Sequence, residues 1–107
     1  MAKIPSHFTK FLEEYPEVGD AYQGLGKAIG TAGPLDKKTQ CLIKLGIAVA
    51  AGQEGGSHSA ARKAAEAGCS PEEMRHAVLL TLTSIGFPAM MRGLSWVEDV
   101  LDGPNQR

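Results

Sequence analysis

A glutamate and a histidine stand four residues apart in the stretch AGQEGGSHSAARKAAEAG, which covers residues 51–68. If a helix begins soon after Gly52, Glu54 and His58 lie one turn apart on the same face. A carboxylate beside an imidazole can orient and charge the ring, as an acid-base pair requires. The spacing also has a plain structural interpretation, because a first-turn glutamate offsets the helix dipole and Glu-His pairs are common solvated contacts. The sequence favours the structural interpretation and keeps the catalytic one as a hypothesis.

The two cysteines are the other reactive side chains. Cys41 and Cys69 form neither a CxxC motif nor the ligand spacing of a zinc site. Cys41 has Leu45 and Ala48 as neighbours at helical spacing, which predicts a buried apolar thiol; a reactive thiol at Cys41 is the less favoured alternative. Cys69 precedes a helix start and is expected to pack as a hydrophobic staple, against Met74 or its neighbours.

No metal and no cofactor are expected. Glu54 and His58 would supply two ligands from one turn, which do not close a coordination shell, and the sequence offers no other dense cluster of ligands. His76 follows a capping sequence on a surface turn and is most simply a solvated side chain.

The composition bounds the class of protein. A chain of 107 residues is expected to form one domain, over residues 1–107. Eleven Lys and Arg residues stand against twelve Asp and Glu residues without a run of one sign, so neither nucleic acid nor an anionic membrane is expected as a partner. The longest stretch without a polar side chain, residues 45–52, is far shorter than the roughly 20 residues that span a bilayer. With no apolar leader in MAKIPSHF, we expect a cytoplasmic protein with reduced thiols.

Hydrophobic spacing and capping signals predict an all-α fold of about six helices. Ser6 and Asp36 are expected to cap helices, and Ser70 with Glu73 forms a capping box before the helix at residues 72–86. The central helix is apolar almost all round after Gln40, which predicts a place in the core. The expected helices cover residues 7–15, 16–29, 37–51, 53–67, 72–86 and 88–101, with breaks at 33–34, 52, 68–70 and 86–88.

The last helix has two apolar stripes. The second could face another subunit, which predicts a homo-oligomer with Trp96 at or near the contact. The alternative is one wide core face within the chain. The first stripe consists of Met90, Leu94, Val97 and Leu101, and the second of Ala89, Gly93, Trp96 and Val100.

Three segments in order carry a family resemblance: LDKKTQCLIKLGIAVAAG, then AAEAGCSPEEMRHAV, then GFP before the final helix. Over residues 34–101 the chain resembles the carboxymuconolactone decarboxylase family, which includes alkyl hydroperoxidase D. The resemblance implies an all-α, alkyl hydroperoxidase D-like helical domain, assembled as a trimer or hexamer.

The resemblance also implies a site. Redox members use a CxxC, a histidine and a glutamate to generate a nucleophilic thiolate. The corresponding positions here hold Gln53 and Gly56, Ala60 and Cys41, so all four residues have changed and dithiol peroxidase activity is not expected. The decarboxylase proper lacks the CxxC and has a glutamate and a histidine four residues apart, as Glu54 and His58 are.

Two hypotheses follow. The first is a lyase-like or hydroperoxidase-like enzyme that uses Glu54 and His58, with Cys41 as a further candidate, on a small organic substrate. Its apolar pocket would lie between subunits, formed by the helix over residues 42–49 and by Phe87. The second is a non-catalytic oligomeric binding or structural protein that kept the fold.

Overall fold

The computed structural model describes residues 6–103 of the chain, and most of them are helical. These residues form six helices of nine or more residues and one single turn, with no strand among them, which confirms the all-α prediction. None of the described helices is long and apolar enough to cross a membrane. The helices are α1 (Ser6–Glu14), α2 (Pro16–Gly30), α3 (Lys37–Ala50), α4 (Glu54–Glu66), α5 (Pro71–Leu79), α6 (Leu82–Ile85) and α7 (Phe87–Asp102).

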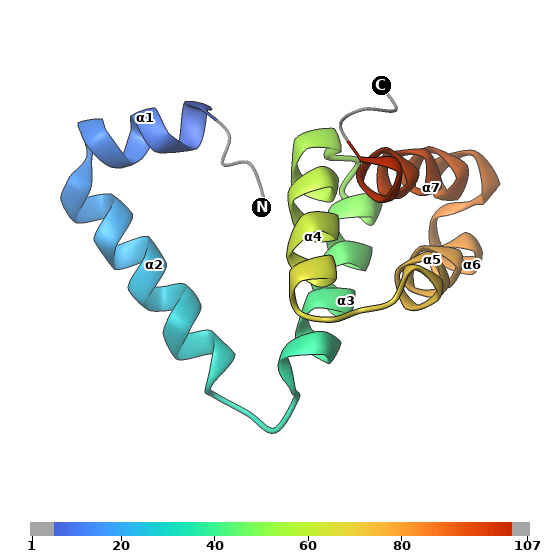
Figure 1. The fold of residues 1–107 in the computed structure, drawn as a ribbon, viewed down its shortest axis with the longest axis horizontal. Coiled ribbons are helices and arrows are strands. Elements are labelled where there is room, and N and C mark those ends of the chain that lie inside the picture. The colour runs from blue at the N-terminus through green and yellow to red at the C-terminus, as the bar shows by residue number, and fades with distance from the viewer. Residues whose placement is uncertain (1–5, 104–107) are drawn as a thin grey trace. The chain divides into compact units, whose positions relative to one another are not determined.

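The contacts divide the chain into two compact units. Residues 1–35 form the first unit, which contains α1 and α2, and residues 36–107 form the second, which contains α3 to α7. Figure 1 shows the helices of each unit. That residues 1–107 act as a single domain stays a prediction from the length.

The expected capping signals set most helix boundaries. Asp36 accepts a hydrogen bond from the backbone N–H of Thr39 at 2.8 Å and so caps α3. Ser70 and Glu73 form the predicted capping box, in which each side chain accepts from the other residue's backbone N–H, at 3.0 and 2.7 Å. Helix α1 begins at Ser6 itself, one residue earlier than the predicted start. Glycines with positive φ follow the ends of α3, α4, α6 and α7, namely Gly52, Gly68, Gly86 and Gly103.

The prediction of one continuous helix over residues 72–86 is wrong. Helix α5 ends at Leu79 and α6 begins at Leu82. At the break, both the N–H and the hydroxyl of Thr81 donate to the carbonyl of Val78, at 2.9 and 2.6 Å. Both bonds join residues three positions apart, whereas the backbone hydrogen bonds of an α-helix join residues four positions apart. A hydroxyl competing for a backbone carbonyl therefore explains the break.

The core of the second unit forms around α3. Leu45 and Val49 of α3 are fully buried, together with Met74 and Val78 of α5 and Val97 of α7. Figure 1 shows α3 beside α4, with α5 and α7 completing the unit. The prediction that α3 is central is confirmed for this side of the helix.

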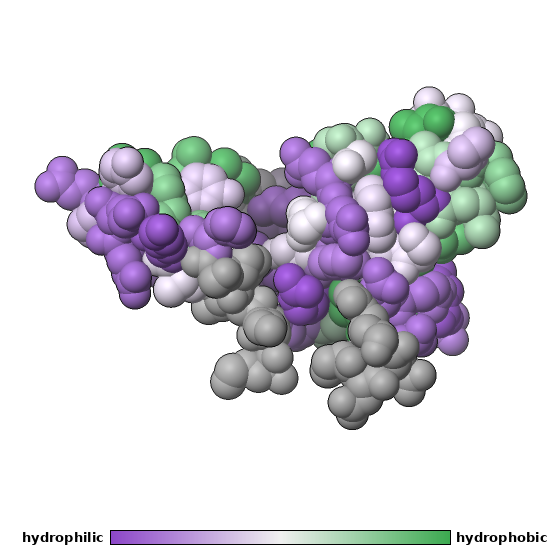
Figure 2. Space-filling model, turned by 90° about the horizontal axis from the view of Figure 1, so that it is seen from above, coloured by the Kyte–Doolittle hydropathy of each residue, from purple (hydrophilic) through white to green (hydrophobic). Residues whose placement is uncertain are grey.

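The outer side of α3 differs from the expectation of a helix buried all round. Ile43 is 47% exposed and Ile47 is 61% exposed. Figure 2 shows that hydrophobic residues reach the surface of the molecule. Within the second unit, the other exposed large hydrophobic residues are Leu79, Leu80, Phe87 and Met91.

The second apolar stripe of α7 is largely used inside the chain. Gly93 is buried so closely against Val49 that a methyl group in its place would overlap the Val49 side chain. Val100 packs against the core, and the guanidinium of Arg92 lies 5.3 Å from the ring centre of Trp96. None of the four residues of this stripe is exposed. The structure therefore favours the single wide core face for α7.

Candidate functional site

The site predicted from Glu54 and His58 lies on the first two turns of α4. Gln53 precedes the helix, and its side chain lies over the first turn, where a Cβ on Gly56 would approach Gln53 Oε1 to 2.9 Å. Glu54 is the first helical residue and is exposed. The helix thus places both predicted residues one turn apart.

His58 is held by a carboxylate from another helix. Its Nε2 lies 3.0 Å from Oδ2 of Asp99 on α7, and the His58 side chain is only 14% exposed, against 37% for Asp99. In the described part of the chain, no hydrogen bond joins His58 to Glu54. An ionised carboxylate only accepts hydrogen bonds, so Asp99 favours the tautomer in which Nε2 carries the proton and Nδ1 is free to accept one. The carboxylate that contacts His58 in the structure is therefore that of Asp99.

The two thiols lie in the buried part of the second unit. Cys41 and Cys69 are both buried and free, and their Sγ atoms donate weakly to the carbonyls of Lys63 at 3.9 Å and Lys38 at 3.7 Å. Burial raises the pKa of the Cys69 thiol above its ordinary value, and the nearby Cys41 and Glu73 raise it further, although Lys38 lowers it. Donation to the carbonyl of Lys38 also favours the protonated form of the Cys69 thiol. The predicted buried character of Cys41 is confirmed.

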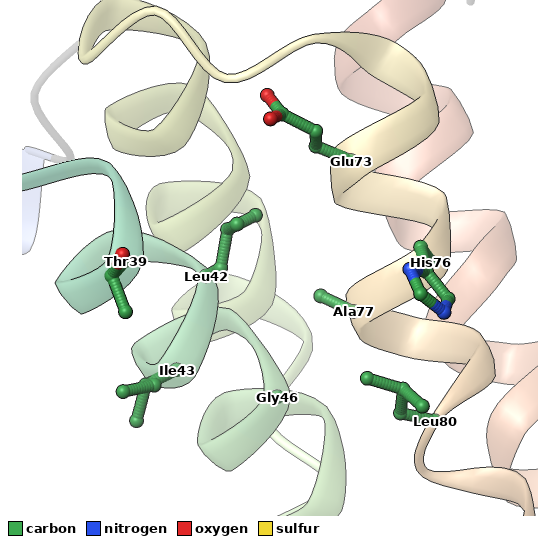
Figure 3. Close-up of a pocket in the computed structure, with 8 residues that line it drawn as sticks. All are labelled: Thr39, Leu42, Ile43, Gly46, Glu73, His76, Ala77 and Leu80. Atoms are coloured by element: carbon green, nitrogen blue, oxygen red, sulfur yellow. The ribbon is translucent and has the colours of Figure 1, made fainter.

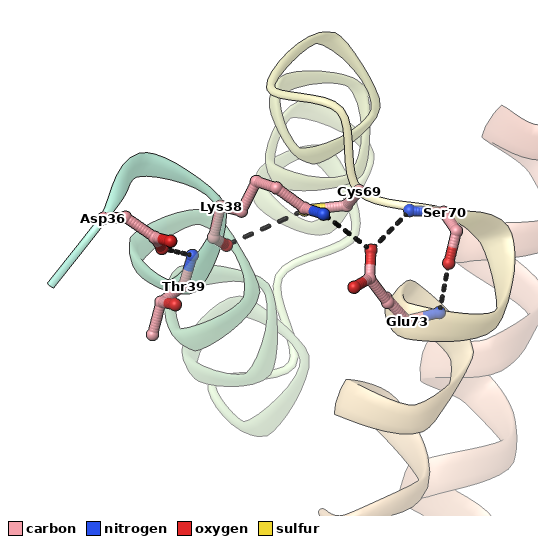
Figure 4. Close-up of polar contacts among 6 residues, drawn as sticks. All are labelled: Asp36, Lys38, Thr39, Cys69, Ser70 and Glu73. Atoms are coloured by element: carbon pink, nitrogen blue, oxygen red, sulfur yellow. Dashed lines mark hydrogen bonds and ion pairs between the residues drawn. The ribbon is translucent and has the colours of Figure 1, made fainter.

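Cys69 also belongs to the buried cluster that contains Met74, as the predicted hydrophobic staple requires. The contact of Cys69 Sγ with the carbonyl of Lys38, on the first turn of α3, shows that the residue after α4 lies near the start of α3. Figure 4 shows Cys69 beside Lys38, which forms an ion pair with Glu73 at 3.4 Å.

Glu73 is occupied by structural contacts. The backbone N–H of Ser70 is the main cause that lowers the pKa of its carboxyl group below the ordinary value, and Lys38 adds to the effect. Figure 4 shows the carboxylate turned toward both groups. A carboxylate held ionised in this way is a poor general acid.

A second feature, which the sequence predicted only in part, is a groove between α3 and α5 (Figure 3). Its volume is about 460 Å³. The α3 wall of the groove agrees with the predicted pocket wall over residues 42–49. The opposite wall is formed by α5, and the predicted pocket residue Phe87 does not line the groove. His76 is exposed and lines the groove. The lining residues are Thr39, Leu42, Ile43, Gly46, Glu73, His76, Ala77 and Leu80.

Side chains that could bind a metal ion do not form a cluster in the part of the chain that the structure describes. Residues 6–103 contain no group of three or more His, Cys, Asp and Glu side chains placed to hold a metal ion.

Comparison with known proteins decides the family. The sequence pattern of the carboxymuconolactone decarboxylase family matches residues 16–99. The chain belongs to this family. The match begins at Pro16 and so takes in α2, which the resemblance over residues 34–101 left out.

A solved structure agrees with the family assignment. The fold is similar to that of an apo carboxymuconolactone decarboxylase family protein from Legionella pneumophila, with a TM-score of 0.78 and 27% sequence identity. The similarity covers 87% of this chain and 83% of the other. None of the curated proteins matches the chain.

Proposed function

We propose that this member of the carboxymuconolactone decarboxylase family acts on a small organic compound by proton transfer, with His58 as the acid-base group. The observation that carries the proposal is the 3.0 Å contact between His58 Nε2 and Asp99 Oδ2. Asp99 orients the ring, while Nδ1 exchanges a proton with the substrate. Because the His58 side chain is 14% exposed, the reacting compound must be small enough to reach the exposed edge of the ring.

Glu54 stays a candidate for a second role at this site. Glu54 lies one turn before His58 and is exposed at the start of α4. This position supports a role in which its carboxylate contacts the substrate and not His58. Cys41 is the weakest of the original candidates, because it is buried and its thiol faces a carbonyl.

The second candidate function is a non-catalytic oligomer that binds a ligand or partner. The groove between α3 and α5 favours it, since none of Glu54, His58 and Asp99 lines that groove. For either function we propose a homo-oligomer, a trimer or hexamer, in the cytoplasm. The exposed apolar side chains support the oligomer, and the two free thiols support a reducing compartment.

Turnover of the compound that gives the family its name tests the catalytic proposal. Carboxymuconolactone is mixed with the purified protein, and its loss is followed by ultraviolet absorbance together with release of carbon dioxide. His58→Gln should lower kcat by about 10²–10⁴-fold, which is the usual contribution of a positioned acid-base group. Asp99→Asn should lower kcat as well, because an amide can present the wrong hydrogen-bonding group to the ring.

Matched variants serve as controls. His7→Gln changes an exposed histidine on α1 and should keep wild-type turnover. Glu54→Gln is compared with Glu72→Gln, since both residues are exposed glutamates in the first turn of a helix. Wild-type turnover that survives His58→Gln would refute the assignment, and a wild type without turnover would favour the non-catalytic candidate.

A further inference from the structure

We propose that Arg92 binds a carboxylate of the small compound on which His58 acts, and so decides which compounds the site accepts. The inference rests on the proposed function and adds the chemical class of the compound and the residue that selects it. All the groups that carry the inference belong to the second unit, residues 36–107.

One side of α7 carries a cation, an aromatic ring and a carboxylate in a row. Arg92, Trp96 and Asp99 follow one another at intervals of four and three residues, so they lie on the same side of the helix. Asp99 contacts His58 of α4, and α4 packs against α7. The row therefore leads from the acid-base group to Arg92.

The other end of the row lies beside the turn that leads into α4. A Cβ on Gly52, between α3 and α4, would lie 3.4 Å from Nη2 of Arg92. Both ends of the row thus contact the short segment from Gly52 to His58. Arg92 and Asp99 are seven positions apart, which is about 10 Å along the helix axis. A gap of this size suits a small organic molecule.

The guanidinium of Arg92 is positioned without being neutralised. It lies 5.3 Å from the centre of the Trp96 ring. No carboxylate of residues 6–103 forms an ion pair with it, whereas Arg75 on α5 is held by two hydrogen bonds to Glu98. A guanidinium that rests on an aromatic ring keeps its N–H donors for an anion.

Neighbouring charges and the Trp96 ring narrow the class of ligand. Glu54 and Asp99 both lie near the segment that the ligand would contact, and they repel a doubly charged phosphate more strongly than a singly charged carboxylate. The Trp96 ring offers apolar surface to the hydrocarbon part of a ligand. The site therefore fits an organic acid whose carboxylate meets Arg92 while its reacting end meets His58.

Arg92 also has a structural role that the experiment must separate from binding. Its guanidinium lies near the end of α3, which has no basic residue in its last turn, so the charge offsets the helix dipole there. Any cation serves that role. A carboxylate, by contrast, pairs with a guanidinium through two parallel hydrogen bonds, which an ammonium group does not form. Arg92→Lys therefore keeps the structural role and weakens binding.

Trp96 gives a direct readout of binding, because it is the single tryptophan of the chain and lies against Arg92. Carboxymuconolactone is titrated into His58→Gln, which should not turn it over, and the Trp96 fluorescence is followed. Calorimetry checks each Kd, and circular dichroism checks the helical content. The fully methyl-esterified lactone is the neutral ligand for comparison. Lys63→Gln is the matched control, since it removes one positive charge from the last turn of α4.

Added to His58→Gln, Arg92→Gln should raise the Kd of the lactone by about 10–100-fold, the usual effect of losing hydrogen bonds to a charged group. Arg92→Lys should raise it by a smaller factor, and Lys63→Gln should leave it unchanged. The ester should bind to the parent protein as weakly as the lactone binds to Arg92→Gln.

Equal affinity for lactone and ester, an affinity that survives Arg92→Gln, or the absence of binding would overturn the proposal. If Arg92→Gln loses helical content, Arg92→Lys decides, and an unchanged Kd in that variant would overturn the proposal as well. Binding that depends on Arg92 in a protein without lactone turnover would support the carboxylate site and refute only the catalytic role of His58.

Discussion

Cys69 illustrates how burial decides whether a thiol can react. The side chain is 7% exposed, and its sulfur faces the carbonyl of Lys38. Burial is the main cause that raises the pKa of its thiol, so the nucleophilic thiolate is less populated than in an ordinary cysteine.

The raised pKa of Cys69 predicts a loss of stability at alkaline pH. In the unfolded chain a thiol titrates near about 8.5, whereas in the folded chain it holds its proton to higher pH. The contribution of the neutral thiol is therefore complete below the unfolded pKa and is lost as the pH rises through the folded pKa. Cys69→Ala lacks this group and should lose less free energy of unfolding than the wild type between pH 7 and pH 10, as measured by urea denaturation. Parallel pH profiles of the two proteins would contradict the prediction.

At the scale of elements, the contact of α7 with α3 depends on Gly93. A methyl group there would overlap Val49, which is fully buried. Gly93→Ala should destabilise the fold by about 1–3 kcal/mol, the usual effect of overpacking a core. Gly46→Ala is the matched control on α3, where the added methyl group meets no atom within 4 Å; it should stabilise by about 0.5–1 kcal/mol because alanine favours the helix. Thermal and urea unfolding distinguish the two, and equal effects would refute the packing argument.

The start of α5 depends on its capping box. Ser70 accepts from the backbone N–H of Glu73 at 3.0 Å, and without the hydroxyl this N–H loses its partner. Ser70→Ala should cost about 1 kcal/mol of unfolding free energy. Ser95→Ala removes a hydroxyl from the exposed face of α7 and should cost less, and a smaller effect for Ser70→Ala would argue against the box.

Local signals made most of the fold predictable. The caps at Asp36 and Ser70 and the glycines with positive φ act within a few residues, so the sequence shows where the helices begin and end. The break at Thr81 was not predictable, because the sequence does not show which hydroxyl among Thr81, Thr83 and Ser84 bonds to a backbone carbonyl at a helix break.

The candidate site was less predictable than the helices. The sequence singled out His58 but paired it with Glu54, its neighbour at helical spacing. Its partner in the structure is Asp99, which lies 41 residues away on α7. Only the packing of α4 against α7 brings the two together, and no local spacing encodes that contact. For the same reason, only the α3 wall of the α3–α5 groove was predicted from the sequence. The second wall comes from α5, a distant segment of the chain.

At the scale of the whole molecule, the family fold is present while the dithiol chemistry of redox relatives is not expected. Matching these relatives predicts Gln53 and Gly56 at the CxxC positions and Ala60 at that of the histidine. The two cysteines that remain are buried, and both sulfurs face backbone carbonyls. Any reaction of this chain should then depend on His58 and Asp99 and not on sulfur.

Hydroperoxide consumption with a dithiol reductant tests this central claim most directly. The wild type, Cys41→Ala and Cys69→Ala are compared with a blank without protein. A dithiol peroxidase needs an accessible thiolate and a second thiol that resolves it as a disulfide. The account predicts that all three proteins consume hydroperoxide no faster than the blank. Turnover by the wild type that either cysteine substitution abolishes would contradict it.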